Sequence, residues 1–420
     1  MFRQILLTVC CAVSLSSIAQ STSLSQKLDS LSARLVKTQE VAGVNVLLIQ
    51  EGKVVYNKAF GYADVATRQP LQTTGIFRIA SQTKAVTSVA VMMLVEEEKL
   101  QLDDPVSRFI PQFKNARVLA EWNPADSSYT TVPAPREITV RDLLRHTSGI
   151  SYPMITGDPK MTPVYLKEGI RAGVGERGSL KNGMEKLAAL PLAHPPGAAF
   201  TYGLSTDVLG YLVEVVSGAS LDAFFRKRIF QPLEMTDTYF RLPNEKAHRL
   251  VSLSQKEDDG FKKVTDPLYG YIQPNYPLEN GLYLSGGAGL VSTTADYARF
   301  LQMLLAKGVY KGQRLLKAET VEMMITNQLP EGIAPGFSFG LGFALVSEEG
   351  HSAGTPGVGT FAWSGVFNTH YWADPEAQVI GLVYAQQYLP ASYSELGTAY
   401  KKVIYTHLNA SNAAAGGRSK

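Results

Sequence analysis

The sequence predicts a mixed fold, α/β plus all-α, in which one antiparallel sheet flanked by helices carries an inserted helical lobe. Strand patterns occur near both ends of the 420-residue chain, while its middle alternates helical segments with Pro- and Gly-rich loops. Hydrophobic residues make up 45% of the chain and charged residues 18%, as in ordinary soluble globular proteins. A chain of this length fits two closely packed lobes better than one simple core.

The first elements follow from the spacing of apolar residues. Leucines recur at helical intervals over 24–35, which predicts an amphipathic helix. Strand-like runs at 44–50 and 53–64 flank a Glu-Gly turn, a pattern typical of an antiparallel hairpin. Apolar residues then keep a helical period from 81 to 100, and they predict a buried helix.

The chain returns to strands after a helical middle. Short helical pieces such as 139–146 and 205–218 lie among long loops between about 103 and 280. Later elements are predicted as a helix at 293–308, strands within 337–346, 369–375 and 378–386, and a helix at 394–408. Strands from both ends of the chain must then share one sheet.

These elements predict one domain at 22–408. Its α/β lobe takes about 22–78 and 310–408, and its helical lobe takes about 79–309. The tail at 409–420 is rich in Ala, Gly and Ser, and we expect it to be disordered.

Residues 1–19 have the features of a cleaved bacterial secretory signal. Arg3 precedes an apolar run that is too short to span a bilayer, and small residues Ser17 and Ala19 follow it. We therefore expect a periplasmic or secreted protein. Both cysteines, Cys10 and Cys11, lie in this segment, so the mature chain has no thiol for a disulfide or for catalysis.

The charge pattern bears on the partners. A formal net charge of +3, without a basic stripe, predicts no nucleic-acid partner and no stable membrane insertion. The chain contains no phosphate-loop motif, no HExxH and no Cys-based metal spacing. We expect a small-molecule ester or amide substrate and no cofactor or metal. The sequence makes no prediction of the oligomeric state.

The segment Ser81-Gln82-Thr83-Lys84 opens the most apolar predicted helix and forms an S-x-x-K element. Residues three apart share a face of a helix, so the Lys84 amine can reach the Ser81 hydroxyl. The helix N-terminus favours negative charge on that oxygen, and an apolar environment favours the neutral amine that accepts its proton. The spacing alone is weak, because about one S-x-x-K is expected by chance in such a chain, and its alternative is a capping serine with a solvated lysine.

Around this element the sequence resembles the serine β-lactamase and penicillin-binding-protein superfamily. It is most similar to the class C-like branch, which contains family VIII carboxylesterases and related acyltransferases. The matching segments, in the order of that branch, are FRIASQTKAVTSVAVMMLVEEEKLQLDDPVSRFIP, ITVRDLLRHTSGIS, FTYGLSTDVLGYLVEVVSG, GGAGLVSTTADYARFLQML and FGLGFALV. The resemblance runs from about Gly43 to Leu408. It implies a β-lactamase/transpeptidase-like fold with the active site in the cleft between the lobes.

The resemblance also assigns catalytic roles. It implies that Ser81 is the nucleophile, that Lys84 activates it, and that Tyr202 shares a proton with Lys84. The backbone amides of Ser81 and Val366 would form an oxyanion hole, which needs main-chain donors rather than a particular side chain.

Two positions depart from the β-lactamase pattern. Leu204 stands where β-lactamases of this branch carry Asn, and Trp363 stands where the Lys of their third motif is expected. We expect Leu204 and the motif Trp363-Ser364-Gly365 to bind substrate. Because both lost groups are polar recognition elements, these residues should favour neutral acyl compounds over an anionic β-lactam.

Other patterns receive no chemical role. The pentapeptide 350–354 fits the G-x-S-x-G nucleophile elbow, but no strand precedes it and no helix follows it in the predicted structure, so Ser352 belongs to a loop. His146 and the Gly-rich run 285–289 resemble family signatures, and we interpret both as scaffold near the cleft.

The sequence therefore predicts a serine hydrolase that forms an acyl-enzyme on Ser81, most similar to carboxylesterases for small acyl esters. Alternatives of the same chemistry are a β-lactamase, a D-amino-acid peptidase and an acyltransferase. A further alternative is a catalytically silent binding protein of the same fold.

Overall fold

The computed structural model of the protein describes residues 24–154, 157–171, 173–281, 283–352, 354–391 and 394–416. The predicted secretory signal at 1–19 lies outside these ranges. Within them no single helix is both long and apolar enough to cross a membrane, although the bent pair Ser205–Ser217 and Leu221–Phe230 qualifies by length and composition.

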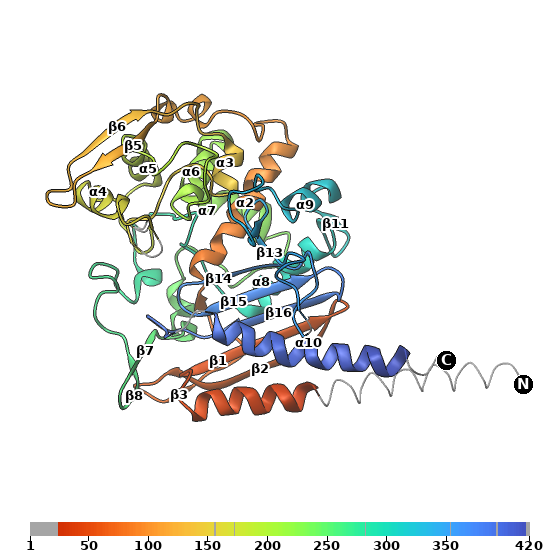
Figure 1. Ribbon diagram of the computed structural model, residues 1–420. Helices are drawn as coiled ribbons and strands as arrows, with labels where there is room; N and C mark the ends of the chain where they lie inside the picture. The colour runs from red at the N-terminus through yellow and green to blue at the C-terminus, as the bar shows by residue number, and fades with distance from the viewer. Residues whose placement is uncertain are drawn as a thin grey trace, which may run out of the picture.

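The predicted antiparallel sheet is confirmed, and both ends of the chain contribute to it (Figure 1). The eight strands described in this sheet follow the spatial order β12-β13-β14-β15-β16-β1-β2-β3. Their bounds are β1 Gly43–Gln50, β2 Lys53–Asp64, β3 Gln69–Pro70, β12 Ser338–Phe339, β13 Ala344–Leu345, β14 Phe361–Gly365, β15 Thr369–Asp374 and β16 Val379–Tyr384. The two halves join where β1 pairs with β16, in a register that runs from Asn45 opposite Tyr384 to Gln50 opposite Val379.

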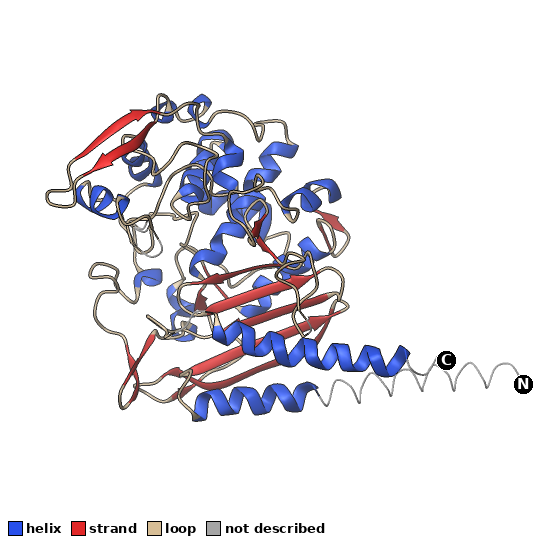
Figure 2. Ribbon diagram, in the orientation of Figure 1, coloured by secondary structure: helices blue, strands red, loops and turns tan. Residues whose placement is uncertain are grey.

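Two terminal helices cover one face of this sheet (Figure 2). They are the predicted first helix, observed at 24–37, and α10, Glu395–Gly416. A buried hydrogen bond of 2.7 Å between the hydroxyls of Ser32 and Tyr400 joins them. Helix α10 continues to Gly416 and so includes 409–416, which the sequence predicts to be disordered; four of these eight residues are Ala, the strongest helix former.

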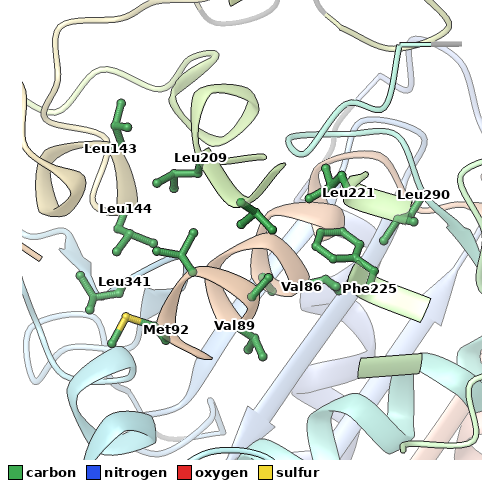
Figure 3. Packing of buried hydrophobic residues seen from close by; sticks show 14 of the residues in the cluster. Val86, Val89, Met92, Leu143, Leu144, Leu209, Leu221, Phe225, Leu290 and Leu341 are labelled. Carbon is green, nitrogen blue, oxygen red and sulfur yellow. The ribbon is translucent and has the colours of Figure 1, made fainter. Parts of the chain in front are cut away.

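The opposite face packs on the main hydrophobic core. Helix α8, Thr294–Leu305, lies against β1, β15 and β16, so this segment of the predicted helical lobe in fact belongs to the sheet's packing. Beyond it lies α2, Thr83–Glu96, with every residue from 83 to 94 buried. Figure 3 shows Val86, Val89 and Met92 of α2 among leucines of several other elements. A helix buried on all sides explains why its sequence is apolar throughout rather than striped.

The remaining elements lie outside the sheet and the helices that cover it. The helices are α3 Val140–Leu144, α4 Met161–Lys167, α5 Leu180–Ala188, α6 Ser205–Ser217, α7 Leu221–Phe225 and α9 Ala318–Met324. Short paired strands are β4 Phe77–Arg78 with β9 Val291–Ser292, β5 Arg117–Trp122 with β6 Tyr129–Pro133, β7 Ser254–Glu257 with β8 Gly260–Lys263, and β10 Val309–Tyr310 with β11 Gln313–Arg314. Short 3₁₀ turns lie at Ala80–Gln82, Val106–Arg108, Pro111–Phe113, Asn244–Arg249 and Tyr276–Leu278, and a π turn lies at Arg226–Phe230.

Candidate active site

Ser81 lies in the 3₁₀ turn Ala80–Gln82, between strand β4 and helix α2. The preceding residue, Ala80, is fully buried and has a left-handed φ of +42°, which is a strained conformation for a residue with a Cβ. Packing around Ala80 must therefore hold the turn in place. The result is a half-buried Ser81 hydroxyl at the N-terminal end of a buried helix.

The Lys84 side chain is 2% exposed and has three oxygen neighbours. Its amine lies 2.9 Å from the Tyr152 hydroxyl, 2.8 Å from the Gly287 carbonyl oxygen and 3.4 Å from the Ser81 hydroxyl oxygen. The Gly287 carbonyl can only accept a hydrogen bond, so one N–H of Lys84 is committed to it. With a second position of the amine taken by Tyr152, the third faces the Ser81 hydroxyl oxygen.

Tyr202 lies beside this group but is held by a different residue. The Lys84 amine sits 4.6 Å from the centre of the Tyr202 ring, over its face. The Tyr202 oxygen instead accepts a hydrogen bond of 3.2 Å from the indole nitrogen of Trp363. The structure thus brings together Ser81, Lys84 and Tyr202, and it adds Trp363 as a donor to the tyrosine oxygen.

Tyr152 is a site residue that the sequence analysis missed. Burial raises the pKa of its phenol well above the usual range, and the nearby Tyr202 and Asp207 raise it further. Tyr152 is therefore a neutral hydroxyl that hydrogen-bonds the Lys84 amine. Its one sequence signal is its position directly after the HTSGIS segment, because that segment matches the family.

The glycine run at 285–289 has a more specific role than scaffold. Its Gly287 carbonyl binds Lys84, and a Cβ added at Gly287 would lie 2.5 Å from a carboxylate oxygen of Asp207. Asp207 is fully buried and accepts a hydrogen bond of 2.6 Å from Ser285. Burial raises the pKa of Asp207, while Ser285 and the positive charge of Lys84 lower it. Asp207 is a second residue that the sequence did not single out.

His146 forms the wall behind Tyr202. Its ring centre lies 4.9 Å from that of Tyr202, and it has a left-handed φ of +58°. Burial and the charge of Lys84 lower the pKa of His146 well below its usual value, so the ring is neutral. This agrees with a supporting role.

The third predicted motif occupies β14, which ends beside the nucleophile turn. A Cβ on Gly365 would lie 2.4 Å from the Ile79 carbonyl oxygen, so glycine allows this close approach. Among the backbone hydrogen bonds of the described residues, neither the Ser81 amide nor the Val366 amide donates one. Their role in an oxyanion hole remains a prediction.

The predicted substrate residues are not equally accessible. Trp363 and Ser364 are half-buried on β14, whereas Leu204 is 1% exposed at the start of α6. Leu204 lines a cavity of about 230 Å³ together with Glu176 and Tyr283. Burial raises the pKa of Glu176 to about 7.

The structure gives the G-x-S-x-G pentapeptide no catalytic setting. Ser352 is exposed in a loop with no strand before it and no helix after it, and Ala353 lies outside the described residues. The neighbouring His351 ring contacts the Pro356 carbonyl oxygen at 2.9 Å. Among the described residues, no group of three or more His, Cys, Asp or Glu side chains could hold a metal.

Comparison with known proteins identifies the family of the chain. The β-lactamase family model matches residues 28–404. Protein Rv1367c of Mycobacterium tuberculosis is 34% identical over 364 residues, which cover 83% of this chain and 86% of the relative. Esterase EstB of Burkholderia gladioli is 30% identical over 364 residues, which cover 84% of this chain and 88% of the esterase.

A solved structure shows the same fold. EstCE1, described as a hydrolase with promiscuous acyltransferase activity, superimposes with a TM-score of 0.78 at 27% identity, over 92% of this chain and 99% of its own. The family match spans most of the chain, and its relatives include esterases and acyltransferases. The chain therefore belongs to the β-lactamase family of serine hydrolases and acyltransferases.

Proposed function

We propose that the protein is a carboxylesterase that forms an acyl-enzyme on Ser81 and acts on small acyl esters. The observation that carries the proposal is the buried Lys84 amine, fixed by Tyr152 and Gly287 and directed at the Ser81 hydroxyl. A lysine held in this way is the base that a serine nucleophile requires.

Acylation begins when the Ser81 oxygen attacks the ester carbonyl carbon. A new C–O bond forms, the hydroxyl proton moves to the Lys84 amine, and the carbonyl oxygen becomes an oxyanion. The amides of Ser81 and Val366 would stabilise this oxyanion, and the N-terminus of α2 favours negative charge at the same place.

The leaving alcohol needs a proton, and we assign its delivery to Tyr202, which lies beside Lys84. The indole N–H of Trp363 is a donor only, so the Tyr202 oxygen accepts from it and keeps its own proton free for the substrate. When the ester C–O bond breaks, that proton passes to the leaving oxygen. The proton that Lys84 took from Ser81 then restores Tyr202.

Water completes the cycle by attacking the acyl-serine carbonyl. Its proton moves to the same lysine and tyrosine pair, and Ser81 regains its proton as the acid departs. If an alcohol attacks in place of water, the same steps transfer the acyl group. The description of EstCE1 as a hydrolase with promiscuous acyltransferase activity favours this as the second function.

Ester rather than β-lactam chemistry is supported by the third motif. Trp363 offers a neutral N–H already bound to Tyr202, whereas a lysine there would offer a cation to an anionic substrate. The esterase name of the Burkholderia relative supports the same choice.

We also propose that the protein acts in the bacterial periplasm or outside the cell. The proposal rests on Arg3, the short apolar run and the small residues that precede the folded chain. Edman sequencing of protein recovered from the periplasm should begin near Gln20. A retained Met1 would contradict it.

A substrate panel tests the catalytic proposal. We expect the wild-type protein to hydrolyse p-nitrophenyl acetate and butyrate with a higher kcat/KM than nitrocefin or a D-alanyl dipeptide. Ser81→Ala should abolish turnover, and Ser352→Ala should leave most of it. A higher kcat/KM for nitrocefin would establish a β-lactamase instead. An inactive Ser352→Ala protein beside an active Ser81→Ala protein would show that Ser81 is not the nucleophile.

A further inference from the structure

A continuous series of aromatic rings leads away from the catalytic group. Tyr202 and Trp363 have ring centres 5.4 Å apart, and Trp363 lies 5.5 Å from Phe339. The series continues from Phe339 to Phe200 at 5.3 Å and from Phe200 to Phe337 at 5.2 Å. We call these five residues the aromatic wall.

The aromatic wall opens toward solvent at its outer end. Phe339 is 1% exposed and forms its base, while Tyr202, Trp363 and Phe200 are half-buried. Phe337 is 37% exposed and is the most accessible ring of the five. A ligand that spans the wall would cover it.

Both sides of the catalytic site contribute to the wall. Phe200 and Tyr202 come from the loop before α6 in the helical lobe, and Phe339 and Trp363 come from β12 and β14 of the sheet. The five side chains of the wall carry no charge of their own, and burial and Lys84 lower the pKa of His146, whose ring contacts Phe339, well below its usual value. Such a surface suits a neutral apolar group, with planar rings favoured by stacking.

We infer that the aromatic wall binds the alcohol portion of the ester, and that this portion is a large, uncharged, aromatic or polycyclic group. The inference rests on the proposed esterase function. It follows from the position of Tyr202: the residue that protonates the leaving oxygen must contact it, so the group attached to that oxygen extends along the rings next to Tyr202. The acyl portion then lies on the other side of the carbonyl.

Two acetate esters with different alcohols test the inference. Ethyl acetate and 2-(2-naphthyl)ethyl acetate share the acyl group and have primary alkoxide leaving groups, so their kcat/KM values differ mainly in recognition of the alcohol. We expect the wild-type protein to prefer the naphthyl ester by about tenfold or more. Phe337→Ala should lower this preference several-fold, and Phe337→Tyr should restore most of it.

Two controls make the result specific. Tyr129→Ala removes an aromatic residue that is 38% exposed on β6, away from the wall, and should leave the preference unchanged. Ethyl 2-naphthylacetate carries the same ring on the acyl side, and its kcat/KM should respond to Phe337→Ala much less. A larger response of this acyl-side ester, or an equal preference in Phe337→Ala and wild type, would overturn the inference.

A binding measurement separates failure of the inference from failure of the proposed function. Calorimetric titration of 2-(2-naphthyl)ethanol into the Ser81→Ala protein needs no turnover. We expect saturable binding that Phe337→Ala weakens about tenfold and that Tyr129→Ala leaves intact. Binding without ester turnover by the wild type would retain the aromatic subsite and refute the esterase, whereas turnover of both esters without this binding would refute the subsite alone.

Discussion

Replacing Trp363 by Phe removes one hydrogen-bond donor and keeps an aromatic ring on β14. The lost bond is the 3.2 Å contact from the indole nitrogen to the Tyr202 oxygen. In the proposed mechanism this oxygen becomes negative as Tyr202 gives its proton to the leaving alcohol. A hydrogen bond to a charged group is worth about 1.5 to 3 kcal/mol, and the length of this one places it at the lower end.

The expected loss is therefore about tenfold in kcat/KM, since about 1.4 kcal/mol corresponds to one power of ten. It should appear only where the leaving group needs a proton. Ethyl acetate releases an alkoxide and should show the full loss, whereas p-nitrophenyl acetate releases a stable phenolate and should show much less. Both esters form the same acetyl-enzyme, so their difference isolates the acylation step.

The assay is a pH-stat for ethyl acetate and absorbance for p-nitrophenyl acetate, with the melting temperature of each protein as a control. Trp363 is half-buried and Phe retains most of its ring contacts, so the melting temperature should change little. An equal loss for both esters would refute the reasoning, because Trp363 would then be positioning substrate rather than supporting proton transfer by Tyr202.

Three further changes probe the neighbouring contacts. Tyr152→Phe removes the oxygen 2.9 Å from the Lys84 amine, which becomes charged when it takes the Ser81 proton; a hydrogen bond to a charged group is worth about 1.5 to 3 kcal/mol, so kcat/KM for ethyl acetate should fall about 10- to 100-fold, and near-normal activity would show that Tyr152 does not position the amine. Gly287→Ala brings a Cβ to 2.5 Å from a buried carboxylate and should lower both activity and melting temperature, unlike Gly350→Ala, whose nearest contact is 3.4 Å; equal behaviour of the two would contradict the close packing. Burial would raise the pKa of Asp142, but hydrogen bonds from an arginine and a threonine outweigh it and lower the pKa to about 2. Asp142 therefore adds about 2 kcal/mol above pH 3.8, lost as the pH falls toward 2, and urea unfolding of Asp142→Asn should lack this component.

Local sequence patterns predicted most of the fold. The hairpin at β1 and β2, the helix α2 and the strands β15 and β16 appear where periodicity placed them, because each element buries a regular face. The segment 337–346 was less successful: it forms two short strands, β12 and β13, separated by a turn in which Gly342 has a φ of +100°. A glycine-rich strand pattern does not distinguish one strand from a hairpin.

Assignment of elements to lobes depended on contacts that no local pattern encodes. Helix α8 was placed in the helical lobe because it precedes the returning strands, yet it packs on β1, β15 and β16. Its apolar face is the same whether it meets a helix or a sheet. Chain order alone therefore misplaced it.

In the candidate site, too, local contacts could be predicted from the sequence and distant contacts could not. Ser81 and Lys84 could be predicted because three residues along a helix bring side chains to one face. Tyr152 is 68 residues from Lys84 and Gly287 is 203 residues from it, and only the fold brings their oxygens to the amine. These two distant contacts decide the chemistry, because they fix two positions of the Lys84 amine and leave the third facing Ser81. Tyr202, bound by Trp363 instead, remains available to the leaving group, so one lysine can serve the nucleophile while a separate tyrosine serves the departing alcohol.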